Sequence, residues 1–175
     1  MAWLSLARQH DTMAAEHNDS PERNSRHSVR IVYNLKKALP QKHQLAYIHK
    51  IDKTLFMHGG LANLFVQLRV APQNRKNVLA AVKAINQMSC ETMWATDSPI
   101  WYRPQLSPNQ NAKRLYRGGE YLQVVGHTPV KEVYLEGGVL SCDTFSTYRD
   151  GTPYGSQAFC IVDTVTWEFE TVKVA

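Results

Sequence analysis

The chain has 175 residues, a hydrophobic fraction of 43% and a charged fraction of 20%. This length and composition fit one globular domain, or a large piece of one, and exclude a globally disordered chain. The net charge of +5 suits an anionic ligand such as a phosphoester. No basic cluster is interleaved with aromatic residues, so we expect no nucleic-acid partner.

The first part of the chain has the patterns of helices. Residues 1–17 predict one helix, and residues 29–39 predict a second with an apolar stripe at helical spacing. A third, short helix is predicted to direct three apolar residues inward: Leu45, Ile48 and Ile51. The segment 1–51 is therefore predicted to be a helical region.

The remainder, residues 52–175, is predicted to be the β-rich part that carries the site motifs. Thr54 to Met57 reads as a short buried strand, whereas Asn74 to Met88 has the apolar face of a helix. Beyond Tyr121 the pattern becomes β, with two predicted hairpins. The first turns at Glu136-Gly137-Gly138, and the second joins strands at 158–163 and 166–174.

No low-complexity run or linker divides the sequence, so residues 1–175 are predicted to form a single domain. The predicted fold class is α/β, in α+β layers, with helices N-terminal and a mixed sheet C-terminal.

The three cysteines, Cys90, Cys142 and Cys160, are too few and too widely spaced for a disulfide framework or a zinc clip. Cys142 and Cys160 lie in strand-like runs and are interpreted as small buried hydrophobes. A reducing compartment follows as the simplest interpretation. No apolar stretch approaches the roughly 20 residues of a membrane span, and the start of the chain does not resemble a secretory signal. We therefore expect a cytoplasmic protein without a membrane partner.

Two short motifs place a histidine next to glycine after an apolar run: F-M-H-G-G-L at 56–61 and V-V-G-H-T-P at 124–129. A buried strand that ends in this way presents a ring nitrogen to the loop at its end. Glycine lets the main chain turn sharply there and approach a ligand. A single such histidine is usually structural, but two of them favour a metal site formed by His58 and His127.

These segments resemble parts of the calcineurin-like metallophosphoesterases, in their serine/threonine protein phosphatase branch. Residues 56–61 resemble the family's F-x-H-G-G-L element, and 125–129 contain its G-H-T-P element. Between them, P-I-W-Y-R at 99–103 is similar to the W-Y-R of the Shewanella-like phosphatases. Asp143-Thr144 resembles the start of the D-T-G turn, although Phe145 replaces the glycine. The resemblance extends from about Val29 to the C-terminus and follows the family's order.

The resemblance implies a metal-dependent phosphoester hydrolase with a β-sandwich flanked by helices. In that family a pair of divalent metals, Mn, Fe or Zn, holds the hydroxide that attacks phosphorus. By resemblance, His58 and His127 would bind the same metal and Arg103 would clamp phosphate oxygens. The planar guanidinium suits that task because it offers two parallel donors to a phosphoryl group. The implied substrate is a phosphoprotein or a small phosphoester.

The resemblance covers only the C-terminal portion of the family's domain. The elements G-D-x-H-G, G-D-x-x-D-R-G and G-N-H-E/D, which supply the other metal ligands, have no match in residues 1–57. Two neutral imidazoles without a carboxylate bind a divalent ion poorly. We therefore expect half a site, and a chain that is inactive alone. We also expect self-association through an exposed sheet edge, where strands would lose neighbours.

Two alternatives stay open at this point. The chain could be a catalytically dead fragment or pseudophosphatase that acts as a binding module. It could also derive from a dinucleoside tetraphosphatase, because those enzymes share G-H-T-P.

Overall fold

The computed structural model describes residues 46–106, 108–110 and 114–173. The helices predicted at 1–17 and 29–39 therefore lie outside the described residues. The chain divides into two compact units, Met1–Tyr47 and Ile48–Ala175. All elements described below belong to the second unit.

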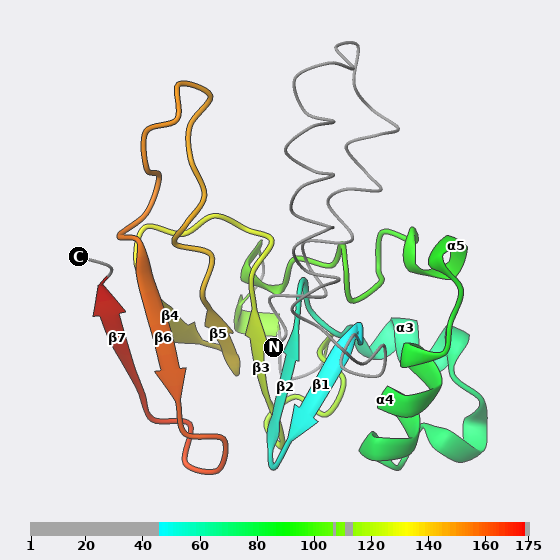
Figure 1. The fold of residues 1–175 in the computed structure, drawn as a ribbon. Coiled ribbons are helices and arrows are strands. Elements are labelled where there is room, and N and C mark those ends of the chain that lie inside the picture. The colour runs from blue at the N-terminus through cyan, green and yellow to red at the C-terminus, as the bar shows by residue number, and fades with distance from the viewer. Residues whose placement is uncertain (1–45, 107, 111–113, 174–175) are drawn as a thin grey trace, which may run out of the picture. The chain divides into compact units, whose positions relative to one another are not determined.

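The second unit has mixed α/β structure, with strands in the majority (Figure 1). Its strands are β1 Ile48–Ile51, β2 Thr54–Met57, β3 Leu122–Val125, β4 Tyr134–Glu136, β5 Val139–Ser141, β6 Ala158–Val162 and β7 Phe169–Lys173. Its α-helices are α3 Asn63–Arg69, α4 Val78–Asn86 and α5 Cys90–Met93. The described residues also include the 3₁₀ turns η2 Pro72–Asn74, η3 Pro104–Leu106 and η4 Pro108–Gln110.

The prediction of a helix that buries Ile48 and Ile51 is wrong, because these residues form strand β1. Ile48 pairs with Met57 across an antiparallel hairpin with β2, and Asp52 in the connecting turn has a φ of 45°. The side chain of Asn86 bonds both the amide and the carbonyl of Ile48, at 2.9 Å each, on the other side of the strand. Cross-strand pairing thus decides the conformation of a segment too short for its pattern to identify.

A five-stranded mixed sheet carries the site segments. Its strand order is β1-β2-β3-β5-β4, and β2, β3 and β5 run parallel. The C-terminal ends of these parallel strands therefore lie at one edge of the sheet, where ligands commonly bind in α/β folds. The strand predicted at Thr54 to Met57 and the hairpin predicted around Gly137-Gly138 are confirmed.

A second layer is formed by β6 and β7, which pair antiparallel as predicted. An apolar cluster of Leu122, Val133 and Leu140 lies between the layers. The residues packed against this cluster come from both sheets: Val124, Cys142, Cys160, Val162 and Trp167. Cys142 and Cys160 are therefore packing residues, as predicted. The wider sandwich arrangement implied by the resemblance stays a prediction.

The helices lie toward the β1 end of the sheet, and the β6–β7 hairpin lies toward β4 and β5 (Figure 1). Helix α4 begins where the Asn77 side chain accepts a hydrogen bond from the Ala80 amide, a standard N-cap. Its buried face includes Val82 and Ile85, whereas Leu79 is 65% exposed. None of the helices in the described part of the chain is long and apolar enough to cross a membrane.

Candidate functional site

The two predicted metal ligands meet at the C-terminal edge of the sheet. His58 follows β2 and His127 comes two residues after β3, and these strands are neighbours with Met57 opposite Val125. The Gly126 amide donates to the His58 carbonyl at 2.9 Å, which extends the ladder past the strand ends. The imidazole centroids are 4.5 Å apart, with an interplanar angle of 61°. Residues 69 positions apart in sequence thus present their rings to one place.

Both rings sit in a packed environment. His58 is 7% exposed. The Trp101 ring lies edge-on to His127 at 5.5 Å, and Trp94 lies 5.8 Å beyond Trp101. Trp101 therefore packs between Trp94 and His127. This contact restricts the orientation of the imidazole.

The backbone at His127 adopts a tight turn. Its φ is 60°, in the left-handed region, and the Thr128 amide donates to the Gly126 carbonyl at 2.7 Å. A one-residue turn of this kind, centred on a residue other than glycine, is strained, and such strain concentrates at functional sites. The turn lets β3 end abruptly and present the ring beside His58.

The glycines after His58 allow a close backbone contact with the segment Pro99 to Tyr102. The Gly59 amide donates to the Pro99 carbonyl at 2.7 Å, and the Gly60 amide donates to the Tyr102 carbonyl at 2.8 Å. A Cβ atom on Gly59 would lie 2.7 Å from the Tyr102 carbonyl oxygen, nearer than such atoms can approach. The first two segments of the family resemblance are therefore adjacent in space.

Arg103 continues this segment directly after Tyr102 and is exposed. Among the described residues its side chain has no hydrogen bond or ion pair. The preceding turn is anchored by Ser98, whose carbonyl accepts from the amides of Trp101 and Tyr102. Burial raises the pKa of the Tyr102 phenol, and the positive charge of Arg114 partly offsets that rise. A second cation, Arg114, is therefore close to the segment that carries Arg103.

Sequence reasoning missed Gln123, which fixes the loop after His58 from within the core. This side chain is 0% exposed. Its Oε1 accepts from the Leu61 amide at 2.8 Å, and its Nε2 donates to the Leu61 carbonyl at 3.2 Å. One side-chain amide thereby satisfies the Leu61 amide and shares the Leu61 carbonyl with the Tyr116 amide. A glutamine inside an otherwise apolar strand, L-Q-V-V, was the signal that could have identified it.

Asp143 lies just past β5, at the same edge, and has the turn role predicted for it. Its Oδ1 accepts from the Ser146 hydroxyl at 2.8 Å, and its carbonyl accepts from the Val130 amide at 2.9 Å. Phe145, which stands where the family has glycine, packs against Phe159 of β6 at 4.8 Å. The side chain at this position therefore joins the two layers.

The two imidazoles, with ring centroids 4.5 Å apart, are the described side chains to consider as ligands of one metal ion. No group of three or more His, Cys, Asp or Glu side chains that could hold a metal is found within the described ranges. The described residues therefore offer two neutral nitrogen donors and no charge to compensate a divalent cation.

Comparison with known proteins yields partial similarities in fold. No protein-family model matches the sequence, and no curated protein matches it. A cold-active protein tyrosine phosphatase of a psychrophilic Shewanella species is similar, with 20% identity and a TM-score of 0.37 over 57% of this chain and 34% of that one. Another structure of a cold-active protein tyrosine phosphatase matches with 17% identity and a TM-score of 0.41 over 82% of this chain and 50% of that one. The chain thus spans between a third and a half of the structures it matches. Similarity at this level assigns no function.

Proposed function

We propose that this chain carries the C-terminal half of the active site of a metal-dependent phosphoester hydrolase. The observation that carries the proposal is the pairing of His58 and His127, with ring centroids 4.5 Å apart at the ends of adjacent parallel strands. Strand ends of this kind hold ligands at fixed positions, because the sheet sets their spacing. The proposed substrate is a phosphoprotein or a small phosphoester.

His58 and His127 would hold one divalent metal, Mn, Fe or Zn. When bound, such a metal polarises phosphoryl oxygens and lowers the pKa of bound water. The chain's own contribution is orientation: Trp101 packs on the His127 ring, and the left-handed turn at His127 fixes where that ring leaves the strand. Imidazoles held in this way lose little freedom on binding a metal.

Arg103 would bind the phosphoryl group. Its exposed side chain follows the segment that is hydrogen-bonded to the Gly59-Gly60 loop, so its backbone is tied to the loop that carries His58. A guanidinium can donate two parallel hydrogen bonds to phosphoryl oxygens and offset charge that grows in the transition state. Arg114, near Tyr102, would add positive potential at the same place.

The carboxylate ligands of the complete family centre would have to be supplied from elsewhere, because the family's aspartate and asparagine motifs have no match in residues 1–57. On this proposal the chain binds a metal weakly and does not turn over substrate by itself. The proposed site therefore lacks its carboxylate ligands.

Metal binding tests the histidine pair. Isothermal titration of the full chain with Zn²⁺ is expected to give one weak site per chain, which His58→Ala and His127→Ala each abolish. His49→Ala, in the same sheet, serves as the matched control and should leave that site intact. Zn²⁺ binding that survives both His58→Ala and His127→Ala would refute the assignment.

Turnover tests the half-site. With Mn²⁺, Fe²⁺ or Zn²⁺ present, the chain is expected to leave p-nitrophenyl phosphate unhydrolysed. Hydrolysis that is lost in His58→Ala would show a complete centre and overturn the half-site. Arg103 is tested by the ³¹P line width of inorganic phosphate in the presence of Zn²⁺. Arg103→Ala should reduce the broadening, whereas Arg69→Ala, an exposed arginine at the end of α3, should not.

A further inference from the structure

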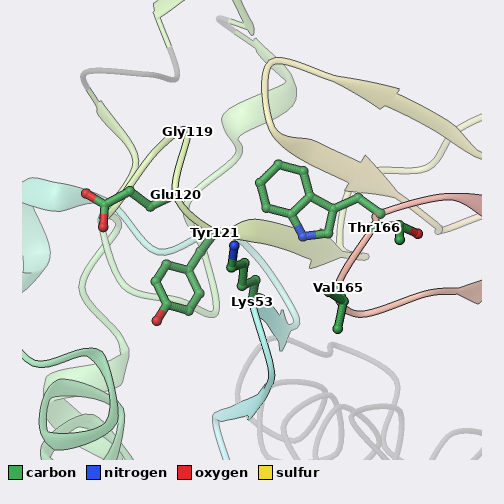
Figure 2. Close-up of a pocket in the computed structure, with 7 residues that line it drawn as sticks. Lys53, Gly119, Glu120, Tyr121, Val165 and Thr166 are labelled. Carbon is green, nitrogen blue, oxygen red and sulfur yellow. The ribbon is translucent and has the colours of Figure 1, made fainter.

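A pocket of about 570 Å³ opens at the other end of the parallel strands. Its wall has three parts: Lys53 at the turn before β2, the segment Gly119 to Tyr121 before β3, and the β6–β7 turn from Val165 to Trp167 (Figure 2). The histidines follow the opposite ends of the same strands. This volume lies in the range of small-molecule sites.

The cation in this pocket is not neutralised by its neighbours. Lys53 lies between Tyr121 on one side and Val165 and Thr166 on the other, while the Glu120 carboxylate points away from it (Figure 2). Glu120 instead pairs with Arg117 at 3.1 Å. In the described residues the Lys53 ammonium has no ion pair or hydrogen bond. A second ammonium, that of Lys50, lies 5.7 Å from the centre of the Tyr121 ring.

The remaining carboxylates near the pocket are engaged in turns. Asp163 accepts hydrogen bonds from the amides of Val165 and Thr166, at 2.8 and 2.7 Å. Asp52 accepts from the Thr164 hydroxyl. Both interactions hold the β6–β7 turn in place, and neither carboxylate bonds Lys53. The Lys53 ammonium is therefore available to an anionic group of a ligand.

The aromatic lining includes a donor without an acceptor. The indole nitrogen of Trp167 is buried and has no hydrogen-bond partner among the described residues. The residue is held at a φ of 68°, and its amide donates to the Asp163 carbonyl at 3.0 Å. A buried donor left unpaired is energetically unfavourable.

We propose that this pocket binds a small aromatic anion, with its ring against Trp167 and Tyr121 and its anionic group on Lys53. The Lys53 ammonium selects against a cationic group beside it, and the two aromatic side chains select against purely hydrophilic anions. The walls converge from segments held by backbone pairing: the Lys53 carbonyl accepts from Leu122, and the Lys53 amide donates to Thr164. The site is therefore formed before the ligand arrives.

Three naphthalene probes of similar shape test the proposal: anionic 1-naphthoate, neutral 1-naphthalenemethanol and cationic 1-naphthylmethylamine. Each is titrated into the full chain with chelator present, so that metal binding at the histidines plays no part. The readout is the ¹H–¹⁵N signal of the Trp167 indole, assigned with Trp167→Phe. We expect naphthoate to shift this signal saturably, and the neutral and cationic probes to bind about tenfold more weakly or worse.

Variants test whether the Lys53 ammonium binds the anionic group of the probe. Lys53→Met should weaken naphthoate binding about tenfold, whereas Lys83→Met, an exposed lysine on α4, and His58→Ala should leave it unchanged. Equal affinity for the neutral probe, an unchanged affinity in Lys53→Met, or no saturable response at millimolar naphthoate would each overturn the proposal. None of these outcomes bears on the histidine site.

Discussion

The two ends of the parallel strands β2 and β3 are built in opposite ways. The end that carries His58 and His127 is packed, with backbone against backbone at Gly59 and ring against ring at Trp101. The end that carries Lys53 opens into a pocket of about 570 Å³. The same strands therefore have a closely packed end and an open end.

The largest predicted loss of stability concerns the close packing next to His58. Gly59→Ala should lower the free energy of unfolding by about 2–3 kcal/mol, because the new Cβ would be forced against backbone oxygens that cannot move aside. Gly126→Ala is the matched control, since its Cβ would meet only the His58 carbonyl at 3.8 Å and should cost less than about 1 kcal/mol. Urea unfolding measures both. Equal losses would mean that packing does not distinguish the two loops.

The buried amide of Gln123 comes next. Gln123→Leu keeps the side chain similar in size but leaves the Leu61 amide unpaired in the core, at a cost of about 1–3 kcal/mol, while the Leu61 carbonyl still accepts from the Tyr116 amide. Leu122→Val, at a neighbouring buried position, changes packing without removing a hydrogen bond and should cost about 0.5–1.5 kcal/mol. Amide exchange at Leu61 should accelerate only in Gln123→Leu. Unchanged exchange there would contradict the role given to Gln123.

The smallest effect concerns the turn at the open end. Hydrogen bonds from the Thr166 and Val165 amides lower the pKa of the Asp163 carboxyl. A carboxyl with a depressed pKa in the folded state stabilises that state above its unfolded pKa, and the contribution is lost as pH falls through the folded pKa. The turn should therefore loosen only in acid below about pH 4. An NMR titration of the Asp163 carboxyl checks this, and a pKa at or above the usual value would contradict it.

Sequence patterns predicted the parts of the fold that depend on local signals. Two glycines at Gly137-Gly138 specify the first hairpin, and the apolar run from Thr54 to Met57 specifies β2. The segment from Ile48 to Ile51 was predicted wrongly, because its apolar spacing fits a helix as well as a strand and only pairing with β2 decides between them.

The candidate site, like the fold, was predicted only in part. His58, His127 and Arg103 are visible in short motifs, and the structure brings the segments that carry them together. Gln123 and the contact of Trp101 with His127 depend on tertiary packing and leave little trace in a single sequence. The pocket at Lys53 and Trp167 unites residues more than a hundred positions apart, so no local pattern could reveal it.

The central claim is that His58 and His127 bind one metal ion together. The most direct measurement is a Zn²⁺ titration followed by long-range ¹H–¹⁵N spectra of the histidine rings, of which the chain has 7. The rings of His58 and His127 should respond together and reach their end point at one ion per chain, before His49 responds. A response of only one of the two rings, or of neither, would contradict the claim.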